Sequence, residues 1–139
     1  MGASTTISFS EFLDTEVFKH IADKMVSEAG IVPVLHCQTV SVVMEGNTIK
    51  GVITESKSGR QAILAKRVID ATGGADVANL AKVDNLLVAG RCVAGDKVSH
   101  AATRQMMCCT VTGQCAGIAA AVSVKECVSC REVKIQKIQ

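Results

Sequence analysis

The feature that most constrains this chain is a pair of short apolar runs, each ending in a turn of small residues. They are VIDATGG (residues 68–74) and NLLVAGR (residues 85–91). Runs of this length that stop at glycine are typical of buried strands, and glycine lets another group approach the backbone closely. Only residues 75–84 separate the two turns, whereas parallel strands are usually joined by a dozen or more residues, most often a helix. Two similar strand ends therefore follow each other with little chain between them.

The first third of the chain predicts a helix. Asp14 is a candidate N-cap, and apolar residues recur at helical spacing from Val17 to Val26. Gly30 is a natural C-terminal stop. We expect a helix from about residue 15 to residue 29.

Several strands are predicted after this helix. Residues 31–36 form an apolar run in which Pro33 suggests an edge strand. Alternating patterns with turn residues between them predict a β-meander from residues 39–44, 49–55 and 61–65. Residues 66–71 and 85–89 are the two strands that end in the glycine turns. A helix rich in small residues is expected over residues 102–124, followed by a charged tail.

Composition and charge exclude some classes of protein. The chain has 139 residues and a formal net charge of +2, and no cluster of basic residues is interleaved with aromatics, so nucleic acid is not an expected partner. Seven cysteines cannot all pair, and the first residues do not have the pattern of a secretory signal. We expect a reducing, cytoplasmic or other intracellular setting.

The uncharged run from Gln105 to Val124 is long enough to cross a bilayer. It consists mainly of Ala, Gly, Cys, Thr and Gln, which gain little from insertion into a membrane. We therefore expect a buried helix of a soluble protein and no membrane span. A membrane-inserted protein is the less favoured alternative.

The chain resembles FAD-dependent oxidoreductases. Residues 34–78, VLHCQTVSVVMEGNTIKGVITESKSGRQAILAKRVIDATGGADVA, resemble the latter part of the flavin-binding domain in enzymes with glutathione-reductase-like topology. NLLVAGRCVAG and ATRQMMCCTVTGQCAGIAAAV resemble the carboxy-terminal flavin-binding block of the same enzymes. The match covers most of residues 14–124, and the two glycine blocks are its specific part.

The resemblance accounts for the two adjacent strand ends. In such enzymes a long substrate-domain insertion separates them, and a βαβ unit carrying Gly-x-Gly-x-x-Gly comes first. Here only residues 75–84 remain between the strands, and the glycine fingerprint occurs nowhere. The chain looks like an N-terminally truncated and internally deleted form. The implied fold class is α/β: a partial Rossmann-like FAD-binding domain with a β-meander and a carboxy-terminal small-residue helix. It forms one domain over residues 1–139, with segments 1–80, 81–124 and 125–139.

The resemblance also implies which residues contact FAD. The adenine lies against the strand at Thr39 and Val40, and the diphosphate region lies near the turn at Ala71, Thr72 and Gly73. Gly90 and Arg91 take the place where many relatives have glycine and a carboxylate touching the ribitol, so Arg91 departs from the broad pattern. A helix beginning near Gly113 points its free N–H groups at the flavin's pyrimidine edge. This last group comprises Gly113, Gln114, Cys115 and Ala116.

Catalytic residues and metal ligands are less well indicated. Arg104, His100 and Cys92 are weak catalytic candidates, because relatives place substrate-facing or flavin-facing groups near these positions. Cys127 and Cys130 have a C-x-x-C spacing, but zinc needs a second pair of ligands and none is suitably spaced. We expect no metal site.

The function that follows is an FAD-binding oxidoreductase, or a remnant of one, which moves hydride or electrons through FAD. The alternative is a non-catalytic binding or interaction protein built on the remaining flavin fold. The substrate cannot be read, because the part of the chain that selects it is absent. Losing these parts leaves apolar surface and a sheet edge uncovered, so we expect self-association. We also expect weak FAD binding and slow turnover or none.

Overall fold

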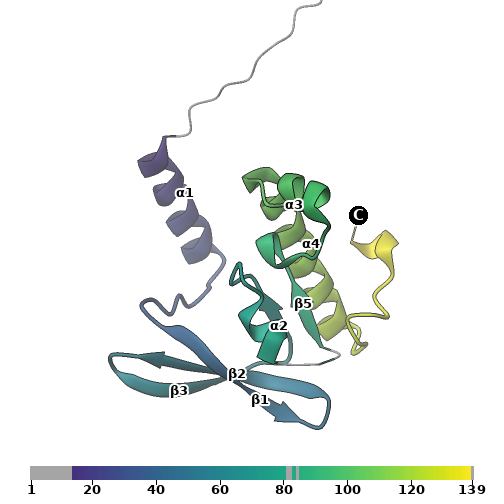
Figure 1. Cartoon of the computed structure of the whole chain (residues 1–139). Helices are drawn as coiled ribbons and strands as arrows, with labels where there is room; N and C mark the ends of the chain where they lie inside the picture. The colour runs from purple at the N-terminus through teal and green to yellow at the C-terminus, as the bar shows by residue number, and fades with distance from the viewer. Residues whose placement is uncertain (1–13, 81–82, 84, 139) are drawn as a thin grey trace, which may run out of the picture. The chain divides into compact units, whose positions relative to one another are not determined.

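The computed structural model describes residues 14–80, 83 and 85–138, and the chain divides into two compact units, residues 1–35 and 36–139 (Figure 1). The described elements form a mixed α/β structure of short sheets and helices, in agreement with the predicted class. The predicted boundaries at residues 80 and 124 within one partial domain stay a prediction.

The first unit contains the predicted helix, α1 (Thr15–Glu28). The Asp14 carboxylate accepts hydrogen bonds from the N–H groups of Glu16 at 3.0 Å and Val17 at 3.1 Å, which satisfies two donors that the first turn cannot pair. Gly30 follows the C-cap in the left-handed region, with φ of +66°. Cap and stop lie where the sequence predicts them.

The strand predicted over residues 31–36 is wrong, because this segment has no regular secondary structure. Pro33 has no N–H to donate to a ladder. His36 has a φ of +55°, which turns the backbone out of the extended conformation. The apolar pattern alone therefore does not form a strand here.

The second unit begins with the predicted meander. Strands β1 (Gln38–Glu45), β2 (Thr48–Ser56) and β3 (Gly59–Leu64) form an antiparallel sheet in that order. A glycine at positive φ lies at each tight turn: Gly46 lies within the first turn, at +57°, and Gly59 directly follows the second, at +105°. The alternating pattern and turn residues thus predicted the sheet correctly.

The two strands ending in glycine turns are shorter than predicted and lie side by side. Strand β4 (Val68–Asp70) pairs in parallel with β5 (Leu86–Val88), so Val68 lies opposite Leu86. Between them the chain forms the short helix α2 (Asp76–Leu80). The brief connection therefore still contains a helix, and the two strands pair in parallel across it.

A small apolar core joins the meander to the parallel pair. Ile49 of β2 is fully buried and Val77 of α2 is 4% exposed. Around them pack partly buried side chains from both sheets and the connection: Val42, Val52, Val68, Val83 and Leu86. Helix α2 thus supplies an apolar side chain that links the two sheets.

The single helix predicted over residues 102–124 is wrong at its start, because two helices occur there. Helix α3 (Lys97–Thr103) begins at Asp96, whose carboxylate caps the N–H groups of Val98 and Ser99. Gln105 then adopts an extended conformation, with ψ of 149°, and α4 (Met106–Lys125) begins after it. The Asp96 cap starts a helix earlier than the apolar pattern indicates, and the extended residue separates the two.

Helix α4 is mostly exposed, which contradicts the expected burial. Only Ala116, Ala119 and Ser123 are buried, and their spacing places them on one face of the helix. Helix α4 contacts β4 and β5. By length and composition alone α4 could cross a membrane: an 18-residue stretch of it has a mean hydropathy of 1.5, and 17% of that stretch is buried. A core helix would be buried over far more of its length.

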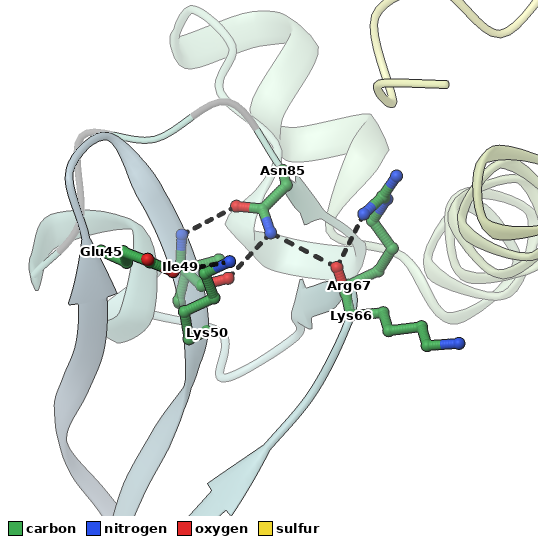
Figure 2. A network of polar contacts seen from close by, with 6 residues as sticks. All are labelled: Glu45, Ile49, Lys50, Lys66, Arg67 and Asn85. Carbon is green, nitrogen blue, oxygen red and sulfur yellow. Dashed lines mark hydrogen bonds and ion pairs between the residues drawn. The ribbon is translucent and has the colours of Figure 1, made fainter. Parts of the chain in front are cut away.

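Asn85 fastens the parallel pair to the meander. Strand β3 ends at Leu64, opposite Gly51, so it does not reach as far as Ile49. The Asn85 side chain takes its place: Oδ1 accepts from the Ile49 N–H at 2.9 Å, and Nδ2 donates to the Ile49 carbonyl at 2.8 Å (Figure 2). Nδ2 also donates to the Lys66 carbonyl at 3.4 Å. One side chain therefore pairs buried backbone groups of two segments.

Replacing Asn85 with alanine should destabilise the protein by about 2–4 kcal/mol, because two buried backbone groups of Ile49 lose their partners. Urea denaturation measures this change. The matched control is Asn79→Ala, which removes an exposed side-chain bond to the Gly74 carbonyl and should cost less than about 1 kcal/mol. Equal effects of the two substitutions would contradict the role given to Asn85.

Candidate functional site

A cavity of about 400 Å³ lies where β4, β5 and the start of α4 meet. Residues that directly follow both parallel strands contribute to it, as expected for the carboxyl edge of a parallel sheet. It is lined by Ala71, Gly73, Ala89, Gly90, Arg91, Arg104, Met106, Cys109 and Gly113. Residues of both glycine blocks therefore meet at one site.

Both turns need glycine. Gly73 has a φ of +85° and Gly90 a φ of +65°, in the left-handed region that favours this residue. A Cβ atom at Gly73 would lie 2.7 Å from Nη2 of Arg91, so a side chain at this position would displace the guanidinium. The N–H of Gly90 donates to Thr112 Oγ1 at 2.9 Å, which fastens the second turn to α4.

The cavity is electropositive. Arg91 and Arg104 line it, and neither forms an ion pair with any residue that the structure describes. No carboxylate is among the described residues of the lining. Helix α4 begins at the same place, and its N-cap, Gln105, makes no side-chain capping bond, so N–H groups of the first turn lack helical partners. This combination favours an anion.

The buried carboxylate of Asp70 fixes the conformation of the first glycine turn. Its carboxylate is 1% exposed and accepts hydrogen bonds from the Thr72 N–H at 3.0 Å, the Thr72 hydroxyl at 2.8 Å and the Ala78 N–H at 2.8 Å. Burial raises the pKa of Asp70, but these bonds and one from Cys92 outweigh it and leave the pKa below the ordinary value. Asp70 is therefore an ionised anchor of the turn. Its signal in the sequence is aspartate two residues before Thr72, the spacing of an Asx turn.

The three weak catalytic candidates are placed differently. Arg104 lines the cavity, but Cys92 and His100 do not. The Cys92 sulfur accepts a hydrogen bond from the Gly73 N–H at 3.1 Å and donates to Asp70 Oδ1 at 3.6 Å, so it supports the turn. His100 is half-buried in α3.

The helix predicted to begin near Gly113 begins at Met106, so the expectation of free N–H groups at Gly113 is wrong. Residues 113–116 lie inside α4, where N–H groups bond within the helix. Of this predicted group only Gly113 lines the cavity; Gln114 and Cys115 are exposed elsewhere and Ala116 is buried. The free N–H groups belong to the turn at Met106.

The remaining predicted contacts are not gathered at this cavity. Thr39 and Val40 lie in β1, where the pairing with β2 is irregular between Thr39 and Ser41. Thr72 faces Asp70 through its hydroxyl. Contact of Thr39 and Val40 with adenine stays a prediction. Across the residues that the structure describes, no three His, Cys, Asp or Glu side chains are grouped to hold a metal ion.

A protein-family model described as FAD dependent oxidoreductase matches residues 2–84 and 81–139. The chain belongs to this family of flavoproteins, which confirms the resemblance. The matched segments meet between β4 and β5, at the place where the lost insertion was inferred. No curated protein and no solved structure matches the chain. FAD is the cofactor of the family, and the chain has a flavin-associated, oxidoreductase-type function.

The cavity residues fit part of FAD. Two uncompensated guanidinium groups and an uncapped helix start suit a diphosphate. A volume of about 400 Å³ is at the lower end of the about 300–1,000 Å³ found for pockets of drug-sized ligands. FAD is larger than such ligands, so the cavity has room for only a part of the cofactor.

The lowered pKa of Asp70 predicts how stability depends on pH. The ionised form is favoured in the folded state, so its contribution is complete above the unfolded pKa of about 3.9 and is lost as the pH falls through the lower folded value. Asp70→Asn should be less stable at pH 7 by about 1–3 kcal/mol. The difference in free energy of unfolding between Asp70→Asn and the unsubstituted chain should become smaller below about pH 4.

Urea denaturation at a series of pH values measures this narrowing. Asp23→Asn, at an exposed position of α1, is the control and should show neither effect. A constant difference between Asp70→Asn and the unsubstituted chain down to low pH would show that the Asp70 carboxylate is not an ionised anchor.

Proposed function

We propose that this chain is a partial Rossmann-like flavoprotein that holds the diphosphate region of FAD in the cavity at the ends of β4 and β5. One observation carries the proposal: two glycine blocks, separate in the sequence, line a single electropositive cavity. Arg91 and Arg104 provide the positive charge, and the family uses FAD. Gly73 and Gly90 add no side chains to the cavity, and because their N–H groups already bond to Cys92 and Thr112, the two arginines and the helix start are the groups that would hold a phosphate.

When bound, FAD supplies hydride or electron transfer. The described residues around the cavity supply binding and orientation: guanidinium donors for phosphate oxygens and a helix start that favours negative charge. His100 and Cys92, two of the three weak catalytic candidates, lie outside the lining. The cavity is thus better equipped to bind a cofactor than to turn over a substrate.

The proposed affinity for FAD is low. Relatives also grip the diphosphate through Gly-x-Gly-x-x-Gly, which this sequence lacks. Several charge-assisted hydrogen bonds of about 1.5–3 kcal/mol each are lost, which weakens binding by about three orders of magnitude or more. We propose slow turnover or none. A reducing, intracellular location is supported by the free state of all seven cysteines.

Titration with FAD, followed by flavin fluorescence, tests the proposal. Gly113→Leu should abolish the residual binding, because Gly113 lines the cavity and its Cβ position is open space. Gly117→Leu is the matched control: it lies one helical turn along α4, is equally open, and does not line the cavity. Circular dichroism should show unchanged helix in both variants, since leucine is a better helix former than glycine.

Arg104→Gln tests the charge at the same site and should weaken binding of ADP, which carries the diphosphate, by about tenfold or more. Arg131→Gln removes an exposed arginine outside the cavity and should leave ADP binding unchanged. Equal binding by all variants would refute the site. If the chain instead co-purifies with stoichiometric FAD, the glycine fingerprint is not essential here, and catalysis becomes the leading function.

A second candidate, an interaction protein, is supported by exposed apolar side chains. In α4, Met106, Met107 and Val111 are 71%, 76% and 56% exposed. In α1, Phe18 and Met25 are 54% and 65% exposed. Large exposed apolar areas mark association surfaces. We propose that the chain self-associates through such surfaces.

Light scattering across a range of protein concentrations should therefore show a dimer or larger species. A stable monomer throughout would refute self-association. In a cell lysate the chain should stay in the supernatant after high-speed centrifugation without detergent. Recovery only in an alkali-resistant membrane pellet would instead favour insertion of α4.

A further inference from the structure

A second and larger cavity, of about 750 Å³, lies at the opposite end of the parallel pair. Arg67 and Asn85 line it, and they come directly before β4 and β5, whereas the residues of the first cavity come after these strands. Part of its wall is apolar and is formed by Ile49, Leu64 and Val124. The volume falls within the range for pockets that hold small organic ligands, about 300–1,000 Å³.

Arg67 brings a fixed positive charge to this cavity. Its Nε donates to Ser123 Oγ at 2.8 Å, Nη1 donates to the Lys66 carbonyl at 2.8 Å, and Nη2 donates to the Val128 carbonyl at 2.7 Å. All three acceptors are neutral, and within the described part of the chain no carboxylate pairs with Arg67. The guanidinium is thus held in place while its charge stays uncompensated. Two of its five N–H donors remain, one on each terminal nitrogen.

Two lysines line the same cavity. Lys50 forms an ion pair with Glu45 at 2.8 Å. Lys66 forms no ion pair with any described residue, and its side chain is exposed (Figure 2). No acidic side chain is among the lining residues that the structure describes. The cavity therefore combines a preoriented guanidinium, an available ammonium group and an apolar wall.

We propose that this cavity binds a small amphipathic organic anion, with a carboxylate or phosphate head against Lys66 and Arg67 and an apolar body against Ile49, Leu64 and Val124. A guanidinium held by neutral acceptors pairs well with such a head, because it is already oriented and has no competing carboxylate. The apolar body distinguishes this ligand from inorganic phosphate. The site is separate from the proposed FAD site and does not depend on it.

Octanoate, octyl phosphate and the uncharged octanamide are suitable probes, titrated against the full chain by two-dimensional NMR. Both anions should bind and shift the resonances of residues at the cavity. Octanamide should bind about tenfold more weakly or worse, because it keeps the apolar body and lacks the charge. Inorganic phosphate should also bind more weakly than octyl phosphate, because it lacks the apolar body. Raising the salt concentration should weaken binding of the two octyl anions and leave the affinity for octanamide unchanged.

Variants of Lys66 test the charge without disturbing the fold, since this side chain is exposed. Lys66→Gln should lower the affinity for octanoate about fivefold, and Lys66→Glu should lower it further. Lys66→Arg keeps the charge and should bind octanoate about as the unsubstituted chain does. Lys57→Gln, an equal change of charge in the β2–β3 turn outside the cavity, is the matched control and should bind as the unsubstituted chain does. Octanamide binding as tightly as octanoate, or equal loss in the Lys66→Gln and Lys57→Gln variants, would overturn the proposal. FAD or ADP binding should not change in the Lys66 variants, which separates this site from the first.

Discussion

The arrangement of the first cavity depends on the buried carboxylate of Asp70. Its oxygen atoms accept hydrogen bonds from Thr72 in the turn, from Ala78 in α2 and from Cys92 in the segment after β5. These three segments would otherwise be joined mainly by a parallel pair of very short strands. Because the carboxylate satisfies donors from all of them, the two glycine turns keep a common position. At the other end of the pair, the Asn85 side chain bonds the backbone N–H and carbonyl of Ile49, which β3 does not reach.

The two cavities follow from this same parallel pair. Backbone after the strands forms the electropositive cavity with Arg91 and Arg104, and residues before the strands form the larger one with Lys66 and Arg67. In both, the arginines and the unpaired lysine lack carboxylate partners among the described residues. A net charge of only +2 conceals this distribution, because none of the acidic residues that the structure describes lines either cavity, and Asp70 is used as a structural anchor.

For helix α4 the sequence pattern predicts the helix but neither its start nor its burial. The run of small, uncharged residues correctly predicted a helix, since it contains no break between Met106 and Lys125. Its start could not be read, because the extended conformation of Gln105 has no sequence signal comparable to Asp14 or Asp96. Its burial could not be read either. Small residues permit close packing on β4 and β5, but whether a partner covers the other faces depends on elements that the described chain does not provide.

The sequence by itself determined the local elements and the family. Capping aspartates, glycine turns and alternating apolar residues specify α1 and the meander, because these signals act over a few residues. The two glycine blocks carry the family resemblance that the family match confirms. Only the tertiary structure decided that Arg104 lines the cavity while Cys92 supports the turn, and that Arg67 faces a second cavity. Such roles depend on contacts between residues far apart in the chain, and the distance in space between them is set by packing, which no local pattern encodes.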